Sequence, residues 1–71
     1  MRARRKITLL YDQHPDDADL ADALLSEAQA VVESIHEADD TGSRIRRTRA
    51  AARLLKEAEY VLTKDEQARS L

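Results

Sequence analysis

The sequence has no cysteine, tryptophan or phenylalanine, and it has only one glycine and one proline. Without cysteine there is no disulfide framework and no thiolate metal site, which suits a reducing cytoplasm. Two tyrosines are the only aromatic residues, so any core must be aliphatic. With one glycine, one proline and 37% charged residues, a disordered chain is an alternative to a folded one. The apolar residues argue against disorder, because they recur periodically rather than being scattered.

Long apolar runs are also missing. No stretch approaches the roughly 18 apolar residues of a membrane span, and the basic start MRARRK lacks the apolar run that follows it in a signal peptide. We therefore expect a soluble, cytoplasmic protein without a membrane partner. With 71 residues the chain forms one domain at most, and a monomer of this size has a marginal core.

Charge is sharply segregated, although the net charge is only −2. Residues 1–6 hold four cations and no acid, and residues 12–43 hold ten acids and no cation. Residues 44–64 then hold seven cations against two acids. Three blocks of alternating sign predict separate acidic and basic surfaces.

The first twelve residues are predicted to form a basic arm that contains a short strand. In RKITLLYD, the residues Ile7, Leu9 and Tyr11 alternate with Lys6, Thr8 and Leu10, which is the period of a strand. A helical lead-in is the competing interpretation.

Residues 15–71 are predicted to form a single helical domain. His14 and Pro15 precede three aspartates, which is typical of a helix start, and no residue breaks the helix before about Ala38. An apolar stripe recurs along this helix at Leu20, Leu24, Ala28, Val31 and Ile35.

The segment HEADDTGS, residues 36–43, is the predicted turn, and Ser43 or Thr41 is the predicted cap of a second helix that runs to about Leu62. Thr63 and Glu66 match a capping box, so a short third helix is expected from Lys64. The predicted fold class is mainly α: two long antiparallel helices, a short C-terminal helix and an N-terminal strand.

A hairpin of two helices covers only part of each apolar stripe, so we expect a homodimer that packs as a helical bundle. The predicted dimer or partner interface comprises Leu20, Leu24, Leu25, Val31, Val32, Ile35, Leu54, Leu55, Val61 and Leu62.

Cations recur along the second helix on the side opposite its apolar residues. At about 100° per residue they fall in a sector of roughly 80° that contains no acid; its members are Arg46, Arg49, Arg53, Lys56, Tyr60 and Lys64. Three interpretations remain: a ridge that binds nucleic-acid phosphates, a surface for an acidic protein partner, or a solvated face. Arg47 lies on the apolar side, where it either reaches the end of the bundle or, preferably, pairs with Asp39 or Asp40.

The order of a basic arm, a strand, a helix, a turn and a basic helix resembles ribbon-helix-helix proteins, a family of small dimers that includes plasmid regulators and antitoxins. RKITL is similar to the family's DNA-reading ribbon, and GSRIRRTRAAARLLKE is similar to its second helix. The resemblance implies that Lys6 and Thr8 point to bases and that Ser43 and Arg44 meet the phosphate backbone.

No catalytic constellation is evident, because the chain has no cysteine, two histidines and no glycine-rich phosphate loop. We therefore expect no enzyme, no cofactor and no metal. The leading hypothesis is a dimeric regulator that binds double-stranded DNA through Arg2, Arg4, Arg5, Lys6, Thr8, Ser43, Arg44, Arg46, Arg49, Arg53 and Lys56. The alternative is a helical-hairpin adaptor, antitoxin or chaperone that binds a partner protein through its apolar stripe.

Overall fold

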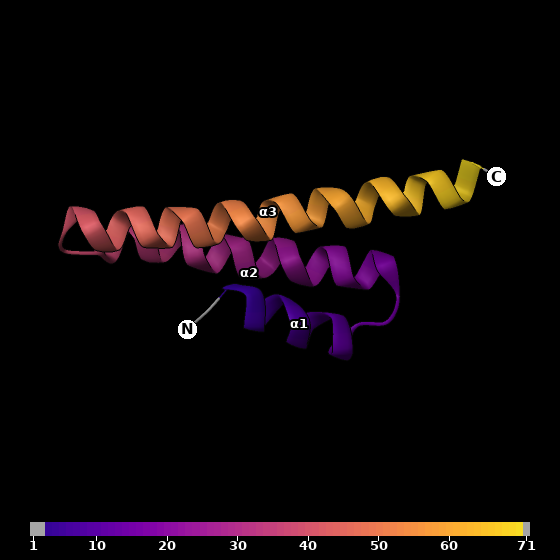
Figure 1. Cartoon of the computed structure of the whole chain (residues 1–71), viewed down its shortest axis with the longest axis horizontal. Helices are drawn as coiled ribbons and strands as arrows, with labels where there is room; N and C mark the ends of the chain where they lie inside the picture. The colour runs from indigo at the N-terminus through magenta and orange to yellow at the C-terminus, as the bar shows by residue number, and fades with distance from the viewer. Residues whose placement is uncertain (1–2, 71) are drawn as a thin grey trace.

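A computed structural model describes residues 3–70 of the chain, with side chains from residue 5 onward. This part of the chain folds into the helices α1 (Ala3–Gln13), α2 (Asp17–Glu37) and α3 (Thr41–Ser70). The long helices α2 and α3 run antiparallel side by side, and α1 packs against both (Figure 1). The prediction of a mainly helical protein is confirmed.

The predicted N-terminal strand is wrong, because residues 3–13 form helix α1. Ile7, Leu10 and Tyr11 recur at helical spacing, and all three pack against the hydrophobic core. Leu9, which alternation would place beside Ile7 and Tyr11, is instead 49% exposed. The helix therefore buries one coherent stripe, and it lies where the hairpin alone would leave that core uncovered.

Helix α2 begins two residues later than the proline predicts. Asp16 is its N-cap and accepts a hydrogen bond from the Asp19 backbone N–H at 3.3 Å. Pro15 thus precedes the cap and separates α1 from α2, because its missing N–H and fixed φ do not suit a helix interior.

The turn between α2 and α3 is shorter than predicted and comprises residues 38–40 alone. Asp40, rather than Thr41 or Ser43, caps α3: its carboxylate accepts the Ser43 backbone N–H at 3.0 Å and the Ser43 hydroxyl at 2.8 Å. Gly42 lies within the first turn of α3, where an added Cβ would be 3.1 Å from the Asp40 carboxylate. A residue without a side chain therefore leaves room for the cap.

The predicted short C-terminal helix is not separate, because α3 continues unbroken to Ser70. The Thr63 capping signal is overridden since no glycine or proline interrupts the chain there, and a helix already under way satisfies the same backbone donors. The C-terminal end of α3 projects beyond the start of α2 (Figure 1), and most side chains of residues 63–70 are exposed.

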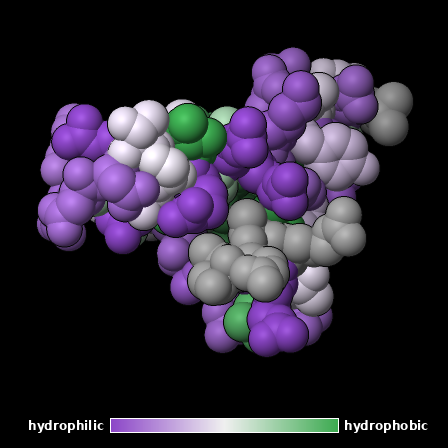
Figure 2. Space-filling view, turned by 60° about the vertical axis from the view of Figure 1, so that its left-hand side comes forward, coloured by the Kyte–Doolittle hydropathy of each residue, from purple (hydrophilic) through white to green (hydrophobic). Residues whose placement is uncertain are grey.

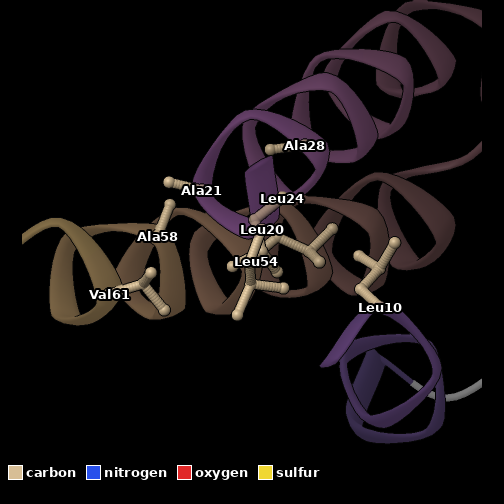
Figure 3. Packing of buried hydrophobic residues seen from close by; sticks show 8 residues of the cluster. All are labelled: Leu10, Leu20, Ala21, Leu24, Ala28, Leu54, Ala58 and Val61. Carbon is tan, nitrogen blue, oxygen red and sulfur yellow. The ribbon is translucent and has the colours of Figure 1, made fainter. Parts of the chain in front are cut away.

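The core lies between α2 and α3 and is closed on one side by α1. Leu24, Leu54 and Val61 are completely buried, and Leu20 is 2% exposed. Alanines allow the two long helices to approach closely: Ala21 lies beside Ala58 in Figure 3, and Ala28 and Ala51 are buried farther along. The described chain measures 47 × 20 × 15 Å, so the domain is an elongated rod.

Candidate nucleic-acid interface

The six side chains predicted to share one face of the second helix are all exposed on α3. We call this set the basic ridge: Arg46, Arg49, Arg53, Lys56, Tyr60 and Lys64. At a rise of about 1.5 Å per residue it extends for roughly 27 Å along the outward side of the helix. Long cationic side chains thus follow one another at intervals of one helical turn.

The central cations of the ridge have no partner within residues 5–70: neither a hydrogen bond nor an ion pair engages Arg49, Arg53 or Lys56. At its ends, Arg46 donates to the Ser43 hydroxyl at 3.1 Å, and the Lys64 ammonium lies 5.6 Å from the centre of the Tyr60 ring. Besides the hydrogen bonds from Ser43, the nearby charge of Arg46 helps to lower the pKa of the Asp40 carboxylate, so the uncompensated positive charge of the ridge is concentrated at Arg49, Arg53 and Lys56.

Glu57 is the acid that borders the ridge, and α1 engages it. The Tyr11 hydroxyl donates to the Glu57 carboxylate at 2.5 Å. Burial, this hydrogen bond and the negative charge of Glu57 raise the pKa of Tyr11 from 10.0 to about 12. Because Arg53 lies four residues before Glu57, the two side chains could pair along the helix. In the structure Glu57 accepts from Tyr11 through one carboxylate oxygen, and Arg53 forms no ion pair with it.

Six of the remaining acids lie on α2, away from the ridge. Exposed acids occupy the side of α2 opposite Leu24, at Asp19, Asp22, Glu33 and Glu37. The hairpin therefore presents an acidic outer face on one helix and a basic outer face on the other. The view of Figure 2 is accordingly dominated by hydrophilic surface, with only small hydrophobic areas.

The start of α3 differs from the phosphate anchor that the ribbon-helix-helix resemblance implies. Ser43 is hydrogen-bonded through both its N–H and its hydroxyl to Asp40, and these two bonds, in that order, lower the pKa of the Asp40 carboxyl. An ionised carboxylate at this position repels phosphate. Arg44 Nε donates to the Ala38 carbonyl at 3.3 Å, so both residues of the implied anchor contribute to the turn.

Arg47 also stabilises the turn. In place of the predicted ion pair with Asp39 or Asp40, it donates to the backbone carbonyl of Ser34 in the last turn of α2. A cation that binds a carbonyl at a helix C-terminus interacts favourably with the helix dipole. Arg47 therefore belongs to the scaffold that holds the ridge.

The N-terminal residues predicted to contact DNA have different environments in the structure. Lys6 forms an ion pair with Glu27 of α2 at 3.4 Å, which fastens α1 to the hairpin. Arg5 and Thr8 are exposed on α1. Arg2 and the side chain of Arg4 lie outside the described part of the chain. The ribbon that the family resemblance requires is not formed by residues 3–70.

The predicted interface residues also separate into groups. Leu20, Leu24, Leu54 and Val61 form the core of the domain itself, so a partner cannot reach them. Val31 and Ile35 are half-buried. Four others are 39–46% exposed and form what we call the apolar strip: Leu25, Val32, Leu55 and Leu62.

The apolar strip lies on the side of the hairpin away from α1. Glu27 and Glu57 both contact α1. Leu25 lies two residues before Glu27, and Leu55 lies two residues before Glu57. Two residues correspond to about 200° of helical rotation, which directs each leucine to nearly the opposite side. The hairpin thus has one face covered by α1 and one uncovered.

Tyr11 and Glu57 are the site residues that sequence reasoning missed. Their contact joins residues 46 positions apart, and no local pattern specifies it. The helical spacing of Ile7, Leu10 and Tyr11 was an available signal for α1, but the strand alternation obscured it. Residues 5–70 contain no group of metal-binding side chains, and no helix in the described chain is long and apolar enough to cross a membrane.

The chain matches no protein-family model, no curated protein and no solved structure.

Proposed function

We propose that this protein is a non-enzymatic module that binds nucleic acid through the phosphate backbone, using the basic ridge of α3. The observation that carries the proposal is the run of Arg49, Arg53 and Lys56, which are exposed and unpaired among the described residues of a chain with 14 acids. Aligned like charges repel one another across each helical turn. A row of phosphates relieves this repulsion and releases its own condensed counterions.

The charge distribution supports the same proposal. Acids on the outer face of α2 and cations on the outer face of α3 give the molecule a strong electric asymmetry. Such a field turns the basic ridge toward a polyanion and accelerates productive encounters. Sequence-independent binding follows, because the cations contact phosphates rather than base edges.

The test compares binding of labelled single-stranded and duplex oligonucleotides of mixed sequence across salt concentrations. The ridge variant is Arg49→Ala/Arg53→Ala/Lys56→Ala. The control is Gln13→Glu/Ser26→Glu/Gln29→Glu, which changes the net charge equally at exposed positions off the ridge. We expect steep weakening of wild-type binding with salt, a loss of at least about tenfold in the ridge variant and a much smaller loss in the control.

Two results would contradict the proposal. One is the absence of measurable wild-type binding to either oligonucleotide at low salt. The other is an equal loss in the ridge variant and the control, because net charge alone would then explain the affinity.

The apolar strip favours a second candidate function, a protein-interaction module. Single hydrophobic side chains scattered over a surface are normal, whereas a group of them on one face is typical of an interaction site. The apolar strip is such a group, with four half-exposed aliphatic side chains on one uncovered face. A second copy of the chain is its simplest partner, since a twofold contact between two such hairpins forms a helical bundle. Self-association of this kind is compatible with nucleic-acid binding, because the ridge is on another side of α3.

A further inference from the structure

The residues on either side of the basic ridge indicate whether it binds duplex or single-stranded nucleic acid. A helix that lies in the major groove meets phosphates on both of its sides. On α3 the cations fill a single sector of roughly 80°, whereas Glu57 lies at one flank and Glu59 beyond the other. Both glutamates would approach the walls of the groove, where phosphates repel them.

The straightness of the ridge also disfavours a duplex. A duplex backbone completes a turn in about 34 Å, so over a ridge of roughly 27 Å one strand would wind through most of a turn and leave the helix surface. A single strand is flexible and can follow a straight line of cations along its whole length.

Tyr60 places an aromatic ring within the basic ridge, and binding of phosphates alone does not require such a ring. Its side chain is 58% exposed, the most exposed large hydrophobic side chain of the described chain. Lys56 and Lys64 lie one helical turn before and after it, and the Lys64 ammonium is 5.6 Å from the centre of its ring. Aromatic rings between cations are how proteins stack unpaired bases while holding the adjoining phosphates.

We propose that the ligand of the basic ridge is single-stranded nucleic acid, with Tyr60 stacking on an unpaired base and Lys56 and Lys64 binding the phosphates on either side. This inference rests on the proposed function and specifies its ligand. Bases paired within a duplex are already stacked, so Tyr60 would contribute little to duplex binding.

The test measures affinity for a short oligothymidylate, for an abasic strand of equal length and for a duplex of that length. Tyr60→Leu removes the ring and keeps an apolar side chain of similar exposure, whereas Tyr60→Phe keeps the ring and serves as the matched control. We expect the wild type to bind oligothymidylate more tightly than the duplex. Tyr60→Leu should weaken that binding by about tenfold, and Tyr60→Phe should restore most of it.

The abasic strand separates stacking from phosphate binding. Because it has phosphates without bases, Tyr60→Leu and the wild type should bind it equally. The inference is overturned if the duplex binds as tightly as oligothymidylate, or if Tyr60→Leu binds oligothymidylate like the wild type. In both cases loss of binding in the Arg49, Arg53 and Lys56 variant would still uphold the proposed function, whereas a wild type that binds none of the three ligands would overturn both.

Discussion

Tyr11 links the N-terminal helix to Glu57, the acid that borders the basic ridge, through a single hydrogen bond. By donating to Glu57, it joins α1 to α3 and binds one oxygen of the carboxylate that lies one helical turn from Arg53. The side chain thus contributes both to packing and to the electrostatics of the candidate site.

The raised pKa of Tyr11 gives a measurable consequence. Tyr60→Phe leaves Tyr11 as the only tyrosine, and its phenolate absorbance should then titrate near a pKa of about 12. Since the folded state holds the proton more tightly than the unfolded state, this stabilisation is complete below pH 10 and is lost as the pH rises from 10 to about 12.

The same variant in concentrated urea provides the control, because an unfolded tyrosine titrates near its ordinary value of about 10. Equal midpoints with and without urea would show that Tyr11 does not engage Glu57 in solution.

Among the helices, α3 contributes to both the core and the apolar strip, and the consecutive residues Leu54 and Leu55 divide these roles. Leu54 is completely buried against α2, whereas its neighbour Leu55 is 46% exposed. The two leucines are neighbours on the same helix and have the same side chain, so a comparison between them isolates the effect of burial.

Leu54→Ala should lower the free energy of unfolding by about 2–5 kcal/mol, because it removes apolar contacts and leaves a cavity. Leu55→Ala should cost less than about 1 kcal/mol at low protein concentration, since an exposed side chain loses little on truncation. Urea denaturation followed by circular dichroism measures both. Since a domain of this size is marginally stable, Leu54→Val serves as a milder variant if Leu54→Ala does not fold. Similar losses for Leu54→Ala and Leu55→Ala would contradict the packing of α2 on α3.

The arrangement of the three helices as a unit determines which surfaces remain available. Because α1 covers one face of the hairpin, part of the apolar stripe that the sequence assigns to a partner is already buried within the chain. The uncovered face keeps the apolar strip, and this is where self-association is expected.

Sedimentation across a range of protein concentrations tests that expectation. We expect the wild type to shift from monomer to dimer as concentration rises, and Leu55→Glu to remain monomeric, because a charge cannot be buried at the contact without a partner. Leu9→Glu is the control, since Leu9 is 49% exposed on α1, away from the strip. A wild type that stays monomeric throughout, or a control that impairs association equally, would argue against the strip.

The sequence by itself determined the features that depend on local periodicity. Helical spacing of leucine, alanine and valine predicted the two long helices and an apolar stripe on each, and the same spacing of arginine and lysine predicted an outward basic face. These features need no knowledge of distant contacts, because side chains three and four residues apart share a helix face wherever the helix lies.

Tertiary structure alone decided the state of the N-terminal segment, because its residues satisfy two periods at once. Ile7, Leu9 and Tyr11 suit a strand, and Ile7, Leu10 and Tyr11 suit a helix. The helix prevails because the hairpin offers a core for Leu10 and a carboxylate for Tyr11, contacts that lie far along the chain. The same docking divides the apolar stripe into a buried core and an exposed strip. Local sequence cannot specify that division, because burial depends on which other element covers the surface.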